Sequence, residues 1–137
     1  MPGTKLSATC APAYFGDMET CIEKTKWFPA MVGNHVADIV EKYGTDSGLV
    51  PKSLTDYIEQ RRGYDYSKHG QSDNPYLDFI TDDIVKSFCV LGEAEDHITK
   101  IQALKNAGTT QFNIYLDNGD EENIITRYGK EVIPAFR

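Results

Sequence analysis

Cysteine is scarce in this chain, and its number is odd: there are three, Cys10, Cys21 and Cys89. A small disulfide scaffold needs a dense, paired set of cysteines, so this class is excluded and a reducing cytoplasm is the expected location. Positive charge is also in deficit, with 14 Lys and Arg against 21 Asp and Glu and a net charge of −7. An acidic chain of this kind is not expected to have nucleic acid or an anionic membrane as its main partner.

Long apolar runs are missing as well. No run reaches the roughly 18 residues that a membrane-spanning helix needs, and the start MPGTK leads into a strand-like segment without the pattern of a signal peptide. Repeats, low-complexity tracts and linkers are also absent. A chain of 137 residues with 40% hydrophobic and 26% charged residues therefore predicts one soluble globular domain over residues 1–137.

The first third of the chain predicts one strand followed by helices. Small apolar residues fill 5–15 and indicate a buried strand, and Asp17 after it is a good N-cap for a helix that begins at Met18. Pro29 is expected to stop or kink that helix. Apolar residues at helical spacing then predict helices over 30–43 and 51–62.

The rest of the chain alternates strands and helices. Residues 63–78 are polar and predict a long irregular loop. A strand is predicted at 87–91, then a helix with an acidic first turn that ends at Gly108, a strand at 111–116 and a last helix. Because strand–helix–strand crossovers are right-handed, this order predicts an α/β fold with three parallel strands and flanking helices.

Five segments together resemble the C-terminal part of the bacterial luciferase-like oxidoreductases, which use a flavin or a deazaflavin. They are CAPAYFGD, WFPAMVGNHVADIVEKYG, FCVLGEAEDHITKIQALKNAG, QFNIYL and the tail RYGKEVIPAFR. Within the second segment, NHVADIVEKYG resembles the branch that uses coenzyme F-420. The resemblance covers nearly all of this chain and about the last two-fifths of a family member.

The resemblance implies a partial (β/α)8 TIM barrel, because a complete barrel takes about 250 residues. The three strands would be the last three of the barrel, and the five that carry much of the flavin pocket would be missing. Such a slice leaves strand edges and an inner face uncovered, with Cys89, Leu91, Phe112 and Ile114 expected on that face. We therefore expect a fragment from a truncated or split reading frame, completed by a homo-oligomer, a dimer or larger.

Candidate site residues follow from the rule that barrel sites lie at the carboxyl ends of the strands. Tyr14 and Gly92 are predicted to bind the cofactor, since a bare glycine backbone at a helix N-terminus can receive a phosphate; the alternative for Gly92 is a tight turn only. Pro51-Lys52 resembles a step associated in the family with a substrate anion. Lys52, Arg61 and Arg62 are therefore predicted to bind substrate, the alternative being a solvated helix face.

The predicted function is that of a flavin- or deazaflavin-dependent oxidoreductase fragment that is inactive alone. FMN or coenzyme F-420 is the cofactor that the family implies, and this chain need not bind either. The alternative is a non-catalytic oligomeric binding or assembly module, and a chain with no function of its own is a third possibility. The histidines stand far apart in sequence, so neither a metal site nor a Cys-His nucleophile is expected. The sequence leaves the substrate, and whether any enzyme activity remains, open.

Overall fold

The computed structural model describes residues 5–33, 35 and 80–137. The chain divides into two compact units, Met1–Thr25 with Cys89–Arg137 and, separately, Lys26–Phe88. The first unit contains the three strands that occur among the described residues. That the two form one domain stays a prediction.

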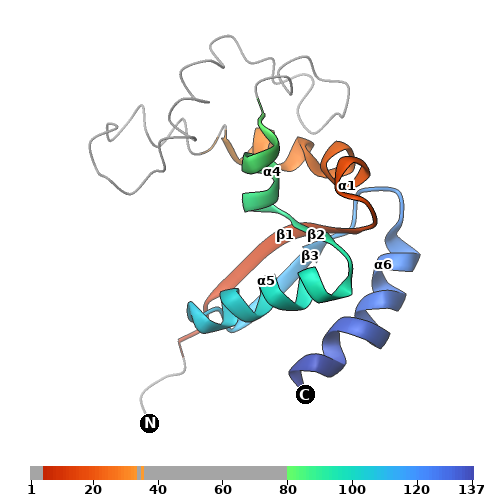
Figure 1. Ribbon diagram of the computed structural model, residues 1–137. Coiled ribbons are helices and arrows are strands. Elements are labelled where there is room, and N and C mark those ends of the chain that lie inside the picture. Colours follow the sequence, from red (N-terminus) through yellow and green to blue (C-terminus); the bar gives the residue numbers. More distant parts are fainter. Residues whose placement is uncertain (1–4, 34, 36–79) are drawn as a thin grey trace. The chain divides into compact units, whose positions relative to one another are not determined.

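The first unit is built on a parallel sheet of three strands, β1 (Ala8–Phe15), β2 (Val90–Gly92) and β3 (Gln111–Tyr115), in the order β2-β1-β3 (Figure 1). The carboxyl end of β1 pairs with β2, from Ala13 opposite Val90 onward. The amino end of β1 pairs with β3, from Ala8 opposite Gln111 onward. The predicted α/β class with three parallel strands is confirmed.

The strand order differs from that of a slice of a barrel. In a barrel each strand pairs with the next one along the chain, which would put β2 in the middle. Here β1 is central, and β2 and β3 occupy its two edges. The reason lies in strand length: β1 has eight residues and β2 only three, so β3 gains a full five-residue ladder on β1 that β2 cannot offer.

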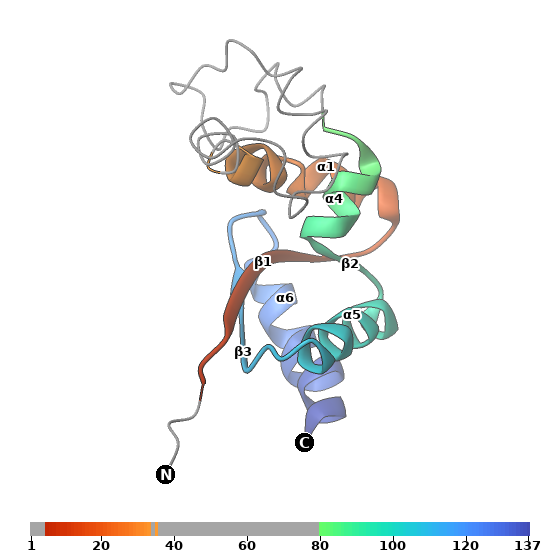
Figure 2. The same cartoon turned by 90° about the vertical axis from the view of Figure 1, so that its left-hand side faces the viewer.

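Three helices cover this sheet: α1 (Met18–Thr25), α5 (Ala94–Asn106) and α6 (Glu121–Arg127). Because β2 and β3 lie on opposite edges of β1, two right-handed crossovers must run over opposite faces. Accordingly α1 lies on one side of β1 and β2, and α5 and α6 lie on the other (Figures 1 and 2). The chain continues from α6 through a π-helical turn, η3 (Tyr128–Val132), into a short 3-10 helix, η4 (Ile133–Phe136).

The core of this unit lies between the sheet and α6 with η3. Its buried members are Ala13, Phe15, Val90, Ile124, Tyr128 and Val132. Phe112 and Ile114 of β3 pack against this core and are half-buried. Cys89 and Leu91 are buried, so the expectation that they lie on an uncovered inner face is wrong. The residues of β3 alternate between exposed and half-buried, and the apolar side of that alternation turns toward the helices.

The start of α1 follows the sequence prediction. The carboxylate of Asp17 accepts hydrogen bonds from the backbone N–H and the hydroxyl of Thr20, each at 2.9 Å. The expected end is wrong, because α1 stops at Thr25 and residues 27–33 are helical again. Pro29 thus lies in the first turn of a new helix, where the N–H that proline lacks has no helical partner to lose.

Around β2 the predicted boundaries shift. Helix α4 (Asp82–Phe88) is preceded by Thr81, whose hydroxyl accepts a hydrogen bond from the N–H of Ile84 at 3.3 Å. The helix includes residues 87 and 88, which were expected to open a strand. The strand begins only at Val90. The end of α5 is as predicted, with Gly108 at φ 102° just beyond it.

Other predicted elements fall on residues that the structure does not describe. These are most of the helix at 30–43, the helix at 51–62 and the loop at 63–78; residues 30–33 and 35 of the first are helical. Among the described residues, no helix combines the length and the apolar character needed to cross a membrane.

Candidate functional site at the carboxyl edge of the sheet

The carboxyl ends of the three parallel strands meet at one edge of the sheet. In the order β2-β1-β3, the connection from β1 leads to its neighbour on one side, and the connection from β2 passes across β1 to the strand on the other side. In open α/β sheets the strand order reverses at such a point, and ligands bind in the crevice outside the carboxyl ends of the strands. The residues that follow the strands, 16–17, 93 and 116–120, form this edge. It is the natural candidate site of the described part of the chain.

Tyr14 lies at this edge, where the sequence predicts it. Burial, and then its electrostatic interactions with Asp120, Cys21 and Glu121, raise the pKa of its phenol above the ordinary value. Two of these causes come from the loop after β3 and the start of α6, so the Tyr14 side chain lies near the residues that close the edge on that side. The phenol is neutral at physiological pH and offers a ring and a hydroxyl.

Gly92 also lies at this edge, but its helix N-terminus is already occupied. A Cβ added at Gly92, whose φ is 114°, would collide with the carboxylate of Asp96. That carboxylate accepts the N–H of Glu93 at 2.9 Å and closes a capping box at the start of α5. A phosphate would have to displace Asp96 to use this donor. The turn by itself accounts for the glycine, and cofactor binding by Gly92 stays a prediction.

The most constrained side chain near this edge is His97, which sequence reasoning missed. It is fully buried, and its ring stacks on Phe15 with 4.0 Å between centroids. Its Nδ1 lies 2.8 Å from the Tyr128 hydroxyl and its Nε2 lies 3.1 Å from the carbonyl oxygen of Tyr14. A carbonyl only accepts, so we assign the proton to Nε2, and Nδ1 accepts from Tyr128.

The charge state of this group follows from its burial. Removal from water lowers the pKa of His97, and the nearby positive charge of Arg127 adds to the effect. Burial raises the pKa of the Tyr128 phenol. Both groups are therefore neutral at pH 7, and both nitrogens of His97 are already used. His97 holds β1, α5 and η3 together and is not available as a base.

A cation also lies at this edge, but its charge is balanced. The guanidinium carbon of Arg127 lies 4.1 Å from the centroid of the Phe15 ring. One of its nitrogens lies 3.0 Å from a carboxylate oxygen of Glu93 and 2.8 Å from one of Glu131. Arg127 thus ties α6 to the start of α5 and leaves no net positive charge for an anion.

The electrostatics of the edge are acidic. Its loops carry Asp17, Glu93, Asp117, Asp120 and Glu121. Hydrogen bonds from Thr20 lower the pKa of Asp17, and backbone hydrogen bonds lower the pKa of Glu121, so both stay ionised at neutral pH. The predicted substrate residues Lys52, Arg61 and Arg62 lie outside the described residues. The described side chains of this edge alone do not make an anion site.

The two buried cysteines, Cys21 and Cys89, do not supply a nucleophile to this edge. Burial raises the pKa of Cys21, and it raises that of Cys89 to about 12. The Cys89 thiol points at the carbonyl of Thr25, 3.8 Å away. Within the described ranges, no three His, Cys, Asp or Glu side chains gather closely enough to hold a metal ion.

The fold defines a class: a parallel α/β protein, whose described residues form the sheet order β2-β1-β3 with helices on both faces. The chain is similar to a 5,10-methylenetetrahydromethanopterin reductase of Methanopyrus kandleri, with 29% identity over 124 residues. The alignment covers 88% of this chain and 32% of the reductase, so the chain spans about a third of the length of this relative. No family model matches the chain.

Proposed function

We propose that this chain carries the C-terminal part of a flavin- or deazaflavin-dependent oxidoreductase of the luciferase-like family. The observation that carries the proposal is the similarity to a reductase over 88% of the chain. The five segments that resemble the family support it, as does the parallel α/β sheet of the described part. The cofactor of the complete protein is coenzyme F-420 or FMN, which supplies the hydride chemistry when bound.

The fit of such a cofactor to the described residues is incomplete. Tyr14 offers a ring at the carboxyl edge, but the edge is acidic and the N–H of Glu93 is bound to Asp96. Both candidate coenzymes are anionic, so cations must come from Lys52, Arg61 and Arg62 or from a further part of the protein. This supports the proposal that the chain alone is inactive.

One observation favours the second candidate function, an oligomeric assembly module. Strand β3 is at an edge of the sheet, and its residues Gln111, Asn113 and Tyr115 are exposed. An exposed strand edge is a template for pairing with another chain. We propose a second copy of this chain as that partner.

The first experiment titrates the purified chain with coenzyme F-420 and with FMN and follows the visible absorbance. Micromolar binding that is lost in Tyr14→Leu and kept in the control Tyr115→Leu supports the oxidoreductase proposal. No binding of either coenzyme, together with a dimer or larger species in light scattering, contradicts it and favours the assembly module.

The contribution of the loop cations is tested separately. If Lys52, Arg61 and Arg62 clamp the anionic coenzyme, its affinity falls as salt is added, because salt screens exposed charges. Replacing the three by alanine then weakens binding and flattens the salt dependence. If the affinity of the native chain for the coenzyme instead rises with salt, the three cations do not hold the coenzyme. A rise means that salt screens the repulsion between the anionic coenzyme and the acidic edge.

A further inference from the structure

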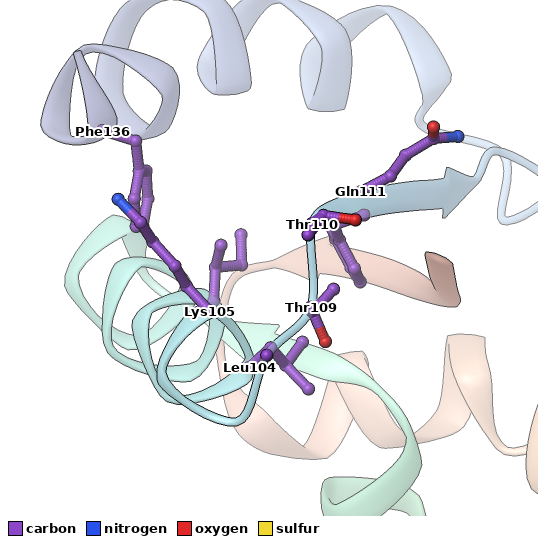
Figure 3. Close-up of a pocket in the computed structure, with 9 residues that line it drawn as sticks. Leu104, Lys105, Thr109, Thr110, Gln111 and Phe136 are labelled. Carbon is purple, nitrogen blue, oxygen red and sulfur yellow. The ribbon is translucent and has the colours of Figure 1, made fainter. Parts of the chain in front are cut away.

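An apolar groove lies between α5, β3 and η4, at the amino end of β3 and away from the carboxyl edge. It consists of two adjoining pockets of about 530 and 290 Å³. Ile101, Phe112 and Phe136 line both of them. Figure 3 shows the larger pocket, with Phe136 and Lys105 on one side and Thr109 to Gln111 on the other.

The groove exists because the helices cover the sheet unevenly. Phe112 packs against the core from β3 and is only half-buried, while Ile133 of η4 is 44% exposed. Apolar surface left in water is unfavourable by about 25 cal/mol per Å². An occupant with an apolar body therefore gains free energy by lying along these side chains. Ligand pockets typically enclose about 300–1,000 Å³, a range that the larger pocket falls within.

The charged residues that line the groove indicate which polar group such an occupant carries. The charged side chain that lines the larger pocket is a cation, Lys105, and no carboxylate side chain lines either pocket. This contrasts with a chain whose net charge is −7. The ammonium of Lys105 lies 6.0 Å from the centroid of the Phe136 ring, so it stands directly beside the apolar wall. Among the described residues no carboxylate forms an ion pair with it.

We propose that this groove binds a free monocarboxylate with an unbranched apolar chain. The chain lies along Ile101, Phe112 and Phe136, and the carboxylate pairs with Lys105. The proposal is independent of the proposed function, because the groove is lined by none of the residues at the carboxyl edge.

The test is calorimetric titration of the chain with hexanoate, octanoate and decanoate, each kept below its micelle concentration, and with decanol. We expect the affinity to rise about fourfold with each added methylene, as burial of hydrocarbon requires. Decanoate is expected to bind up to about fivefold more tightly than decanol, the range of an exposed ion pair. Affinity that does not depend on chain length overturns the proposal.

Two variants separate the charged from the apolar part. Lys105→Met should abolish the preference for decanoate over decanol while decanol still binds. The control Lys130→Met removes an exposed lysine outside the groove and should keep the preference. An unchanged preference in Lys105→Met overturns the assignment of Lys105.

The apolar wall is tested by Ile133→Asp, at a position exposed enough to accept a charge. It should weaken decanoate binding at least tenfold with the melting temperature kept. A chain that binds phosphatidylglycerol vesicles but no free decanoate overturns the proposal in favour of a membrane lipid.

Discussion

At the scale of single residues, His97 shows what sequence spacing reveals and what it hides. The helix that carries it has an apolar stripe at Ala94, Ile98 and Ile101, and position 97 falls on the same side. The position of His97 on the apolar side of the helix therefore indicated that its side chain is buried. Its partner Tyr128 is 31 residues further along the chain, and no local pattern links the two. The hydrogen bond is therefore visible only in the structure.

Protonation of His97 should destabilise the fold in acid. Because burial lowers its pKa in the folded chain below the ordinary value of about 6.5, the unfolded chain binds the proton more readily. Stability is then fully present above about pH 6.5 and falls as the pH drops below it, by up to about 1.4 kcal/mol per pH unit. Urea unfolding at pH 7 and pH 5 measures this slope. His97→Gln should flatten it, and equal slopes in both proteins would contradict the prediction.

Tyr128→Phe tests the same hydrogen bond at neutral pH. The substitution keeps the ring and leaves the buried Nδ1 of His97 without its donor, which costs about 1–3 kcal/mol. Chemical denaturation gives the free energy of unfolding directly. Tyr115→Phe, at a 40% exposed position, serves as control and should lose less. A loss no larger than that of the control is incompatible with a structural role for the pair.

At the scale of elements, the helix starts and ends that depend on a few neighbouring residues were predicted correctly. The boundary between α4 and β2, which depends on tertiary structure, was not. The cap at Asp17, the acidic start of α5 and its end at Gly108 are all encoded within a few residues, and all three are present. The strand expected at 87–91 starts late because the residues at its beginning complete the last turn of α4. A short apolar run fits a helix end and a strand equally well, so sequence could not decide.

The two glycine turns that end β1 and β2 offer a matched comparison. Gly16 and Gly92 have φ of 130° and 114°, but an added Cβ meets nothing at Gly16 and meets Asp96 at Gly92. Gly16→Ala should cost about 1–3 kcal/mol of backbone strain. Gly92→Ala should cost about 1 kcal/mol more, because the cap of α5 is lost as well.

A double-mutant cycle on thermal or urea unfolding separates these causes. In an Asp96→Gly background the carboxylate and the Cβ of residue 96 are both gone, so Gly92→Ala should cost only about as much as Gly16→Ala. Strict additivity of Gly92→Ala and Asp96→Gly would show that the Asp96 side chain does not press on this turn.

At the scale of the whole molecule, the strand order decides which edges are open. Sequence predicted the three parallel strands that the described residues contain, because alternation and handedness are chain-local rules. It could not predict that β1 is central, since that depends on which ladders are longest once the strands meet. The same order places Tyr14 and Gly92 at one edge, as predicted, while the predicted cations lie in the part not described.

If copies of the chain associate through β3, a charge on its exposed side should separate them. Asn113→Lys places a lysine at this sheet edge, a device that natural edge strands use against pairing. The mass from light scattering at rising protein concentration should fall toward that of one chain. The control Asn106→Lys, at the end of α5, makes the same charge change elsewhere and should leave the mass unchanged. Equal masses for both variants would place the interface elsewhere.

The central position of β1 has a consequence for how the chain is made. The N–H of Ser7, just before β1, bonds to the hydroxyl of Thr110, 103 residues later. At about 5–20 residues per second, a ribosome takes several seconds to deliver β3 after β1 has emerged. Among the described strands, β1 therefore leaves the ribosome before both of its partners, and its backbone stays open to other nascent chains until β3 follows.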